Sequence, residues 1–409
     1  MRAALCMALL LMACAEEQRA QPQPETLATV MGRKLFEAGM DHARNRRHAE
    51  AIAAYREAVE LMPGAPQVRY NLGNAYFSSG MLEEATREYR HAIELDADYV
   101  EAHYQLGGVF IRLKKYEEAV PHLTEAVRIH PGHVPSYNAL GLLHKRRGSY
   151  DEAVASYERA LQADSTRAEV WYNLGTVHSK RADLEAAKQA FSAAIRLDST
   201  RARPHGALGA IHLEERRFEK ARRHLERAVR LSPLRPQPHY DLGQAYMRLG
   251  EQEKGRRALA AFKRLEAEEK MIRSLEFTLL SEPDDAQRHY DLGVLYGQRA
   301  QFDRAAERYR RAIALDTTHA DALVNLGNIQ LRRQRLDLAR DHLTRAIATD
   351  STHANAHNSI GNLHMVERNF PAAAAAFRRA ARLDPGNEEY RRNLQIAQGV
   401  DPEPADSPR

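Results

Sequence analysis

Apolar residues recur along this chain with a period of 34 positions. The pair Leu-Gly stands at 72–73, 106–107, 140–141, 174–175, 208–209, 242–243, 292–293 and 326–327, with Ala38-Gly39 and Ile360-Gly361 as variant copies. Twelve residues after each glycine comes a small residue, and four further on, in most copies, a large apolar or aromatic one. The period therefore divides most of the chain into ten copies of one structural unit.

Within each copy the apolar spacing is helical and predicts two amphipathic helices of about 12–15 residues joined by a short turn. The glycines lack a side chain where we expect the two helices to cross closely, opposite a large residue such as Tyr89 or Phe191. Between copies, proline or Asp-Ser-Thr and Asp-Thr-Thr stop one helix and can cap the next. A single pair cannot bury its own apolar stripe, so we expect the pairs to stack into a solenoid.

This pattern resembles the tetratricopeptide repeat (TPR), and the stretch VRYNLGNAYFSSGMLEEATREYRHAIELD at 68–96 follows the family consensus closely. The resemblance implies an all-α fold, a right-handed superhelical solenoid of about ten helix-turn-helix repeats with a C-terminal capping helix. We assign repeats 1–7 to residues 32–269, repeats 8–10 to 286–387, the capping helix to 388–399 and a disordered tail to 400–409.

Copy seven breaks the period, since Leu242 and Leu292 stand 50 positions apart. We assign residues 270–285 to a helical insertion that lengthens the second helix of repeat 7. Its apolar residues Ile272, Leu275 and Leu279 share one helical face. Two alternatives remain for that face: it packs into the stack as an extra helix, or it forms an exposed arm that contacts a partner or a second copy of the chain through residues 265–280.

The resemblance also implies a binding surface, because TPR proteins bind extended peptides or partner helices along an inner, concave face lined by the first helix of each repeat. Aromatic, amide and basic side chains at these inner positions are suited to recognition of a peptide. The alternative is an inner face that only contacts solvent. The candidate partner-binding residues are Tyr70, Asn74, Phe77, Tyr104, Arg112, Asn138, Lys145, Tyr172, Lys180, Tyr240, Gln244, Arg248, Tyr290, Asn328, Arg332, Asn358 and Asn362.

Charge is nearly balanced, with 60 Lys and Arg against 55 Asp and Glu and a formal net charge of +5. Such a balance is typical of a solvated surface with many ion pairs. The run RRFEKARRHLERAVRLSP at 216–233 is basic, but glutamates interleave at helical spacing and favour a solvated face over nucleic-acid contact. We therefore expect no nucleic-acid partner.

The sequence contains no HExxH, P-loop, GxSxG or GxGxxG motif. His144, His178 and His212 fall in the same position of successive repeats, on the order of 10 Å apart if helices pack normally, which is too far for ligands of one zinc ion. We expect them to replace the usual tyrosine between the helices. The expected protein is not an enzyme and has no catalytic residue, metal, cofactor or small-molecule substrate.

The chain opens with MRAALCMALLLMACAEEQ, whose apolar run of eleven residues is too short to cross a membrane. Arg2, the apolar run and the small residues after it fit a secretory signal peptide over residues 1–14. The sequence Leu11-Met12-Ala13-Cys14 resembles a lipobox, which implies lipidation of Cys14 and a flexible tether over 15–31. Cleavage at Ala13-Cys14-Ala15 would instead release a soluble protein, and an uncut start is the third alternative.

Together these features predict a non-catalytic scaffold or adaptor for partner proteins at the bacterial cell envelope, similar to bacterial TPR lipoproteins. We expect the chain to be exported and anchored through lipid, at the periplasmic face of the outer membrane. The alternative is a soluble periplasmic subunit that delivers substrate to a separate catalytic chain.

Overall fold

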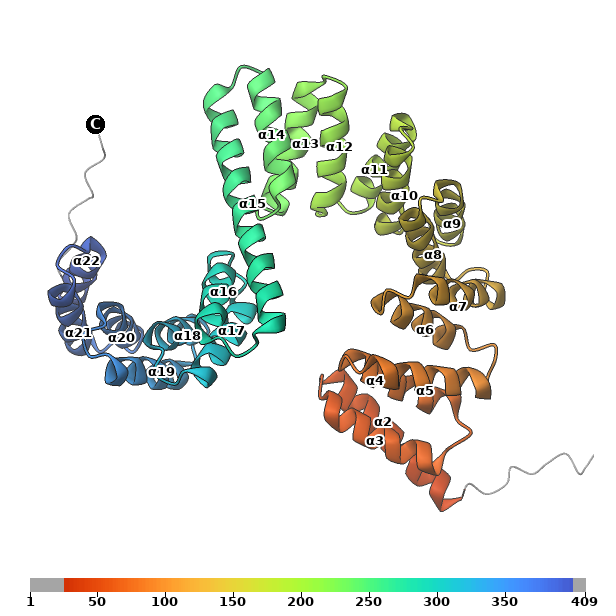
Figure 1. Ribbon diagram of the computed structural model, residues 1–409, viewed down its shortest axis with the longest axis horizontal. Helices are drawn as coiled ribbons and strands as arrows, with labels where there is room; N and C mark the ends of the chain where they lie inside the picture. The colour runs from red at the N-terminus through yellow and green to blue at the C-terminus, as the bar shows by residue number, and fades with distance from the viewer. Residues whose placement is uncertain (1–25, 400–409) are drawn as a thin grey trace, which may run out of the picture. The chain divides into compact units, whose positions relative to one another are not determined.

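The computed structural model describes residues 26–399, and these residues form 21 helices and no strand (Figure 1). Cys14, most of the expected tether and the expected tail lie outside the described residues. None of the described helices has the length and apolar character needed to cross a membrane. The chain divides into two compact units, Met1–Leu231 (unit 1) and Ser232–Arg409 (unit 2).

Unit 1 contains the helix pairs of repeats 1 to 6. Within it, each second helix packs against its own first helix and against the first helix of the next repeat. The helices are α2 (Leu27–Arg44), α3 (His48–Leu61), α4 (Pro66–Ser78), α5 (Leu82–Leu95), α6 (Val100–Arg112), α7 (Tyr116–Ile129), α8 (Val134–Arg147), α9 (Tyr150–Ala163), α10 (Ala168–Lys180), α11 (Leu184–Leu197), α12 (Ala202–Glu214) and α13 (Phe218–Leu231).

Unit 2 contains the helix pairs of repeats 7 to 10 and a closing helix, α22, that packs against α21. Tyr390 and Ala397 of α22 are buried, whereas Ile396 is exposed. The helices are α14 (Pro236–Arg248), α15 (Gln252–Ser281), α16 (Ala286–Gln298), α17 (Phe302–Leu315), α18 (Ala320–Arg332), α19 (Leu336–Thr349), α20 (Ala354–Val366), α21 (Phe370–Leu383) and α22 (Glu388–Ala397).

The close crossing of the two helices is confirmed in every repeat. A Cβ atom added to the repeat glycine would lie 2.5–2.8 Å from the large side chain of the second helix, which is closer than real Cβ contacts occur. Gly73 meets Tyr89, Gly209 meets Leu225, and the same holds from Gly39 to Gly361. The alanines of the second helices are fully buried beside these rings, as at Ala85. The spacing that defines the period is therefore the spacing of the tightest contacts.

The turn within each repeat contains one residue in the left-handed conformation, which the sequence pattern did not reveal. This residue is glycine in three repeats, with φ of +79° to +81° at Gly80, Gly148 and Gly250. In the other seven repeats it is not glycine, and φ is 55° to 61° at residues such as Lys114 and Ala182. The amide of the following residue bonds back to the helix, as Asp183 does to the His178 carbonyl at 2.9 Å, so the turn closes despite the strain.

Ring N–H groups form hydrogen bonds with backbone carbonyls in the turns between repeats. The sequence pattern did not reveal this feature either. The indole nitrogen of Trp171 donates to the Ser165 carbonyl at 2.9 Å. Imidazole nitrogens stand at the equivalent position in other repeats and lie 2.8–3.1 Å from the carbonyl six residues earlier, as His239 does from Pro233. Many of the histidines are therefore structural groups at the junctions between repeats.

The three histidines singled out from the sequence are buried or half-buried, and the His212 ring lies 5.8 Å from His224 on the second helix of its repeat. His212 is buried with its Nδ1 atom 3.3 Å from the Glu215 carboxylate, and His178 and His144 are half-buried. Burial lowers the pKa of His144, and a weaker opposing effect comes from Glu152. No group of three or more metal-ligating side chains converges within residues 26–399.

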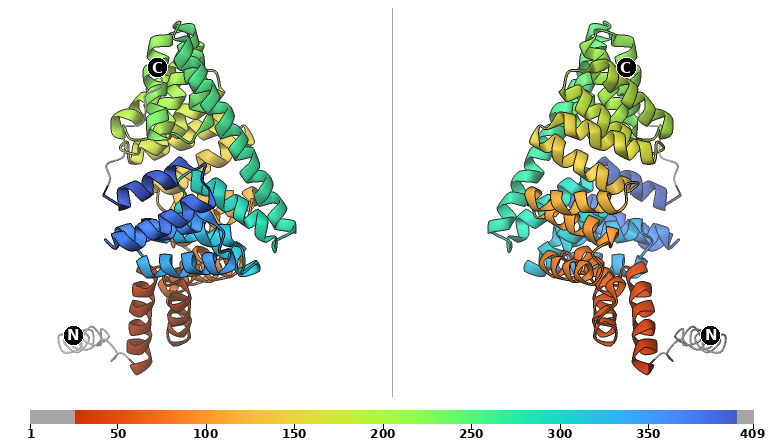
Figure 2. Two further views of the ribbon diagram at one scale, coloured as in Figure 1. Left: turned by 90° about the vertical axis from the view of Figure 1, so that its left-hand side faces the viewer. Right: turned by 90° about the vertical axis from the view of Figure 1, so that its right-hand side faces the viewer.

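The insertion in repeat 7 is a continuation of the second helix. Helix α15 has 30 residues, against 14 in the second helices α13 and α17, and it extends past its neighbours in Figure 2. The stripe that we assigned, as one alternative, to an exposed arm is not exposed: Ile272 and Leu279 are buried, and Leu275 packs against the same core. The stripe faces α16 of its own unit, so these three residues are not free to contact a partner.

Polar contacts also fix the far half of α15 to α16. The Arg299 side chain is only 9% exposed and donates to Glu268 at 3.2 Å and to the Leu265 carbonyl at 3.1 Å. The Tyr296 hydroxyl donates to Glu276. Because the guanidinium meets both a carboxylate and a backbone carbonyl, its burial is compensated.

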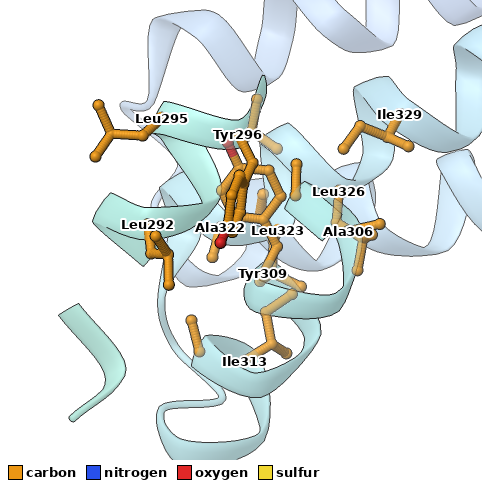
Figure 3. Packing of buried hydrophobic residues seen from close by; sticks show 14 of the residues in the cluster. Leu292, Leu295, Tyr296, Ala306, Tyr309, Ile313, Ala322, Leu323, Leu326 and Ile329 are labelled. Carbon is orange, nitrogen blue, oxygen red and sulfur yellow. The ribbon is translucent and has the colours of Figure 1, made fainter. Parts of the chain in front are cut away.

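The largest core cluster belongs to unit 2 and begins at this junction. In Figure 3, Tyr296 and Tyr309 lie in the middle of the cluster with Leu323 and Leu326 beside them. The cluster continues from α15 through α16 and α17 to α18 and α19. The long helix is therefore an integral part of the unit that carries repeats 8 and 9.

Candidate protein-binding surface

Neighbouring first helices contact each other in parts of each unit, and we call the first helices of a unit its first-helix wall. In unit 1, α2 contacts α4, and α10 contacts both α8 and α12; in unit 2, α18 contacts α20. The predicted partner-binding residues all lie on first helices. The contacts of each side chain decide whether it is available to a partner.

Repeats 2 and 3 contain a cluster of tyrosine rings that pack at tilted angles. The Tyr70 ring is half-buried, with centroid distances of 5.1 Å to Tyr99 and 5.9 Å to Tyr89. Burial and the neighbouring Tyr70 raise the pKa of Tyr99 to about 12. The side-chain oxygen of Asn74 accepts a hydrogen bond of 2.7 Å from the Tyr89 hydroxyl, a contact that does not use its amide nitrogen.

Arginine lies over an aromatic ring at the next position along this wall. The Arg112 guanidinium carbon is 4.7 Å from the Phe77 ring centroid, and its Nη1 atom donates to the Phe77 carbonyl at 3.3 Å. The Tyr104 ring meets His133 edge-on at 5.3 Å. Stacking holds an exposed cation in one orientation, which lowers the entropy lost when it binds a partner.

Repeats 4 and 5 place two lysines close together. The Lys145 ammonium donates to Thr176 at 3.3 Å, and burial and the nearby Lys180 lower the pKa of Lys145. Beneath them, the Asn173 amide donates to Asn138 at 2.9 Å. Two neighbouring cations beside polar side chains favour a carboxylate or another anion as ligand.

A hollow in unit 2 lies between repeats 8 and 9 and has a volume of about 270 Å³. Two predicted residues, Asn328 and Arg332, line it. The Arg332 guanidinium carbon lies 4.7 Å from the Phe302 ring centroid, which repeats the arrangement of Arg112 and Phe77. Gly297 contributes its bare backbone to the hollow. The floor therefore combines an aromatic ring, an amide and a positioned cation.

Asn325, also in the lining, was missed as a site residue. Its side chain hydrogen-bonds Tyr290 and Tyr309, and burial raises the pKa of both hydroxyls, so both stay protonated at neutral pH. The Tyr290 ring also lies 4.7 Å from His319. Asn325 directly precedes the Leu326-Gly327 pair, the position that Asn173 has in repeat 5, and this shared position was the signal that could have found it.

The remaining aromatic and polar candidates lie at separate points. Tyr240 is 39% exposed and its ring packs 5.1 Å from Phe262, while Gln244 and Arg248 follow it on α14. Tyr172 is half-buried against Phe191 at 5.8 Å. They flank the inner wall without a hollow of their own among the described cavities.

One predicted contact is wrong. Asn358 is only 3% exposed, and its side-chain oxygen accepts a 2.9 Å hydrogen bond from Asn393 of α22. The closing helix covers this position, because the last repeat has no following repeat to pack against. Asn362, one turn further along α20, is half-buried.

Family models match most of the repeats. A model described as TPR repeat matches residues 47–80 and 73–114, and models described as tetratricopeptide repeat match 98–166, 146–211, 207–267, 290–354 and 337–388. These matches span well over half of the chain. The chain belongs to the tetratricopeptide repeat family. TPR proteins are typically non-catalytic repeat scaffolds, and the repeats support a scaffold for protein–protein interaction.

Several solved structures are similar to part of this chain. PilF of Pseudomonas aeruginosa is 19% identical with a TM-score of 0.47, over 52% of this chain and 97% of its own. YrrB, described as a TPR protein with an unusual peptide-binding site, is 23% identical with a TM-score of 0.37, over 42% of this chain and 88% of its own. MamA is 20% identical with a TM-score of 0.38, over 41% of this chain and 92% of its own. No curated protein matches the chain.

Proposed function

We propose that this TPR protein is a scaffold that binds an extended segment of a partner protein along its first-helix wall, with the hollow of repeats 8 and 9 as a principal contact. The observation that carries the proposal is the grouping of Asn328, Arg332 and Phe302 around that hollow. An amide pairs with peptide backbone, and a stacked arginine binds a carboxylate or carbonyl.

The size of the hollow favours a side chain of a polypeptide as its occupant. Pockets that enclose drug-sized ligands have volumes of about 300–1,000 Å³, and this one is about 270 Å³. The rest of an extended ligand would contact the wall outside the hollow. In unit 1, Lys145 and Lys180 supply a position for an acidic side chain of such a ligand.

The test uses peptides selected from a display library against the purified full chain, with affinities measured by isothermal titration calorimetry. The double variant Asn328→Ala, Arg332→Ala is expected to weaken binding at least tenfold, since both groups meet the ligand. The control variant Arg378→Ala, Arg379→Ala changes two exposed residues of α21 and should bind normally. The proposal would be refuted if the selected peptides bound the Asn328→Ala, Arg332→Ala variant as tightly as they bind the control variant and the wild type.

We further propose that the scaffold works at the bacterial cell envelope, anchored through lipid on Cys14. The proposal rests on the short apolar run and the Leu11-Met12-Ala13-Cys14 sequence. Replacing Cys14 by alanine removes the acceptor thiol but keeps a site for ordinary signal peptidase. The variant is expected in the soluble periplasm and the wild type in the membrane fraction. A soluble wild-type protein whose N-terminus carries no acyl mass would contradict the anchor.

A further inference from the structure

A second hollow, in unit 1, is lined mainly by second helices. It has a volume of about 500 Å³ and runs between α11 and α13, the second helices of repeats 5 and 6, with residues of α12 at its base. Because it is built from second helices, it is separate from the first-helix wall of the proposed function. We call it the outer groove.

Three cations of the outer groove have no acidic partner. Arg196, Lys220 and Arg223 line the groove, are exposed and form no ion pair with any residue in the range 26–399. The fourth lining cation, Lys188, is neutralised by Glu185 and Glu215. The groove therefore carries an excess of positive charge.

This excess is local to the groove. Elsewhere in unit 1, arginines at the equivalent positions of other repeats have acidic partners. Arg128, the equivalent of Arg196 in repeat 3, meets Glu125 at 2.7 Å, and Arg87, the equivalent of Arg223 in repeat 2, meets Glu84 at 3.6 Å. In repeats 5 and 6, Ala193 and Lys220 stand where those glutamates stand, so Arg196 and Arg223 lack such a partner. An anion from another molecule would complete the pattern.

The base of the groove is partly apolar. Leu208 is buried at the base and Ile195 is half-buried. The lining also includes His224, whose pKa burial and the neighbouring His205 and His212 lower to about 4, so it is neutral at physiological pH. The groove thus offers an apolar contact surrounded by cations.

We propose that the outer groove docks an acidic segment of a partner protein. Its carboxylates would pair with Arg196, Lys220 and Arg223, and one apolar side chain would cover Leu208 and Ile195. Nucleic acid fits less well for two reasons. The lining contains no Phe, Tyr or Trp on which a base would stack, and Glu219 and Glu226 interrupt the basic residues of α13.

The experiment measures fluorescence anisotropy with the purified full chain and three labelled probes. The first is a nine-residue peptide with one central leucine flanked by glutamates, the second has glutamine at each glutamate, and the third is an oligothymidylate of equal charge. The glutamate peptide is expected to bind and to weaken as salt is raised. The variant Lys220→Glu, Arg223→Glu should weaken it at least tenfold. The control Arg378→Glu, Arg379→Glu should bind it like the wild type.

Several outcomes would overturn the proposal. The proposal fails if the glutamate peptide does not bind the wild-type protein, or if the glutamine peptide binds it equally well. It also fails if the groove variant binds the glutamate peptide as tightly as the wild type does. Tighter binding of the oligothymidylate, lost in the groove variant, would make the groove a nucleic-acid site instead. If the charge reversal unfolds the chain by circular dichroism, the neutral variant Lys220→Gln, Arg223→Gln replaces it. The variant Asn328→Ala, Arg332→Ala should still bind the peptide, which separates this proposal from the first.

Discussion

Gly175 illustrates how the fold depends on a missing side chain. An added Cβ would lie 2.7 Å from two carbons of the Phe191 ring. Gly108, also on a first helix, is different, because its Cβ would meet only the Gln105 side chain at 3.9 Å. The equivalent position in repeat 4 already carries Leu142, which is 42% exposed. Two glycines in similar helices are therefore under very different constraints.

The variant Gly175→Leu should overpack the crossing and lower the free energy of unfolding by about 1–3 kcal/mol or more. It should also change the fluorescence of Trp171, one turn before it and the single tryptophan of the chain. Urea unfolding followed by this fluorescence measures both effects. The matched variant Gly108→Leu should be neutral or stabilising by up to about 1 kcal/mol, since leucine is the better helix former. Equal stability of the two variants would contradict the packing.

His224 should make the protein sensitive to acid. Its Nδ1 atom is 3.1 Å from that of His205, and its pKa is lowered to about 4. An unfolded histidine titrates near 6.5, so the unfolded state takes up this proton first and stability falls as pH drops from about 6.5 to 4. His224 alone should lower the free energy of unfolding by about 1–3 kcal/mol over this pH range.

The variant His224→Ala tests this effect, because repeat 5 carries Ala190 at the same position. Urea unfolding at pH 7 and pH 4.5 should show a smaller loss for the variant than for the wild type. An identical loss in both proteins would exclude His224 as the source.

At the scale of the helices, the ten repeats could be predicted because each depends on a tight contact that only small residues allow. The turns and the packing of α15 could not. Lys114 and Ala182 give no sign in the sequence that they adopt φ near +60°. The stripe of Ile272, Leu275 and Leu279 has the same spacing whether it meets α16 or a partner, so only the structure separates these alternatives.

The residues of the first-helix wall could also be predicted only in part. The repeat places Asn328 and Arg332 on one helix face, but the hollow also needs Phe302 from the preceding second helix. The burial of Asn358 depends on Asn393, 35 positions later and outside the repeats. Contacts between repeats decide which inner residues stay available, and a pattern within one repeat does not contain them.

In the turn within each repeat, exchanges between glycine and alanine should change stability in opposite directions. Glycine adopts positive φ without the cost that other residues have, which is about 1–2 kcal/mol. The variant Ala182→Gly should therefore stabilise the protein by about 1 kcal/mol, and Gly148→Ala should destabilise it by a similar amount. Differential scanning calorimetry of both variants checks this, and a lower melting temperature for Ala182→Gly would show that the turn relaxes in solution.

Helix α15 gives the sharpest test of an element. Changing Leu275 and Leu279 to glutamate introduces two charges at the α16 contact and should cost several kcal/mol. The control on the same helix is Phe277→Glu, Leu280→Glu, since these side chains are 76% and 82% exposed. Thermal melts should separate the two double variants clearly. An unchanged melt for Leu275→Glu, Leu279→Glu would revive the exposed arm.

At the scale of the whole molecule, the protein is a TPR scaffold in which each unit has its own first-helix wall. Within a unit, neighbouring repeats share helix contacts, so the wall is held by the same core that stabilises the fold. The aromatic, amide and basic groups on this wall are preorganised by stacking and hydrogen bonds to their neighbours. Such preorganisation is what a surface for an extended partner requires.

Site-specific photocrosslinking in cells tests the central claim most directly. A photoreactive phenylalanine analogue is placed at exposed positions on the first helices, Lys180 and Gln298, and at exposed positions on the second helices outside the outer groove, Arg159 and Arg379. The account predicts discrete protein adducts from the first pair and none from the second. Adducts that form equally at all four positions, or only at Arg159 and Arg379, would contradict a scaffold that binds its partners along the first-helix wall.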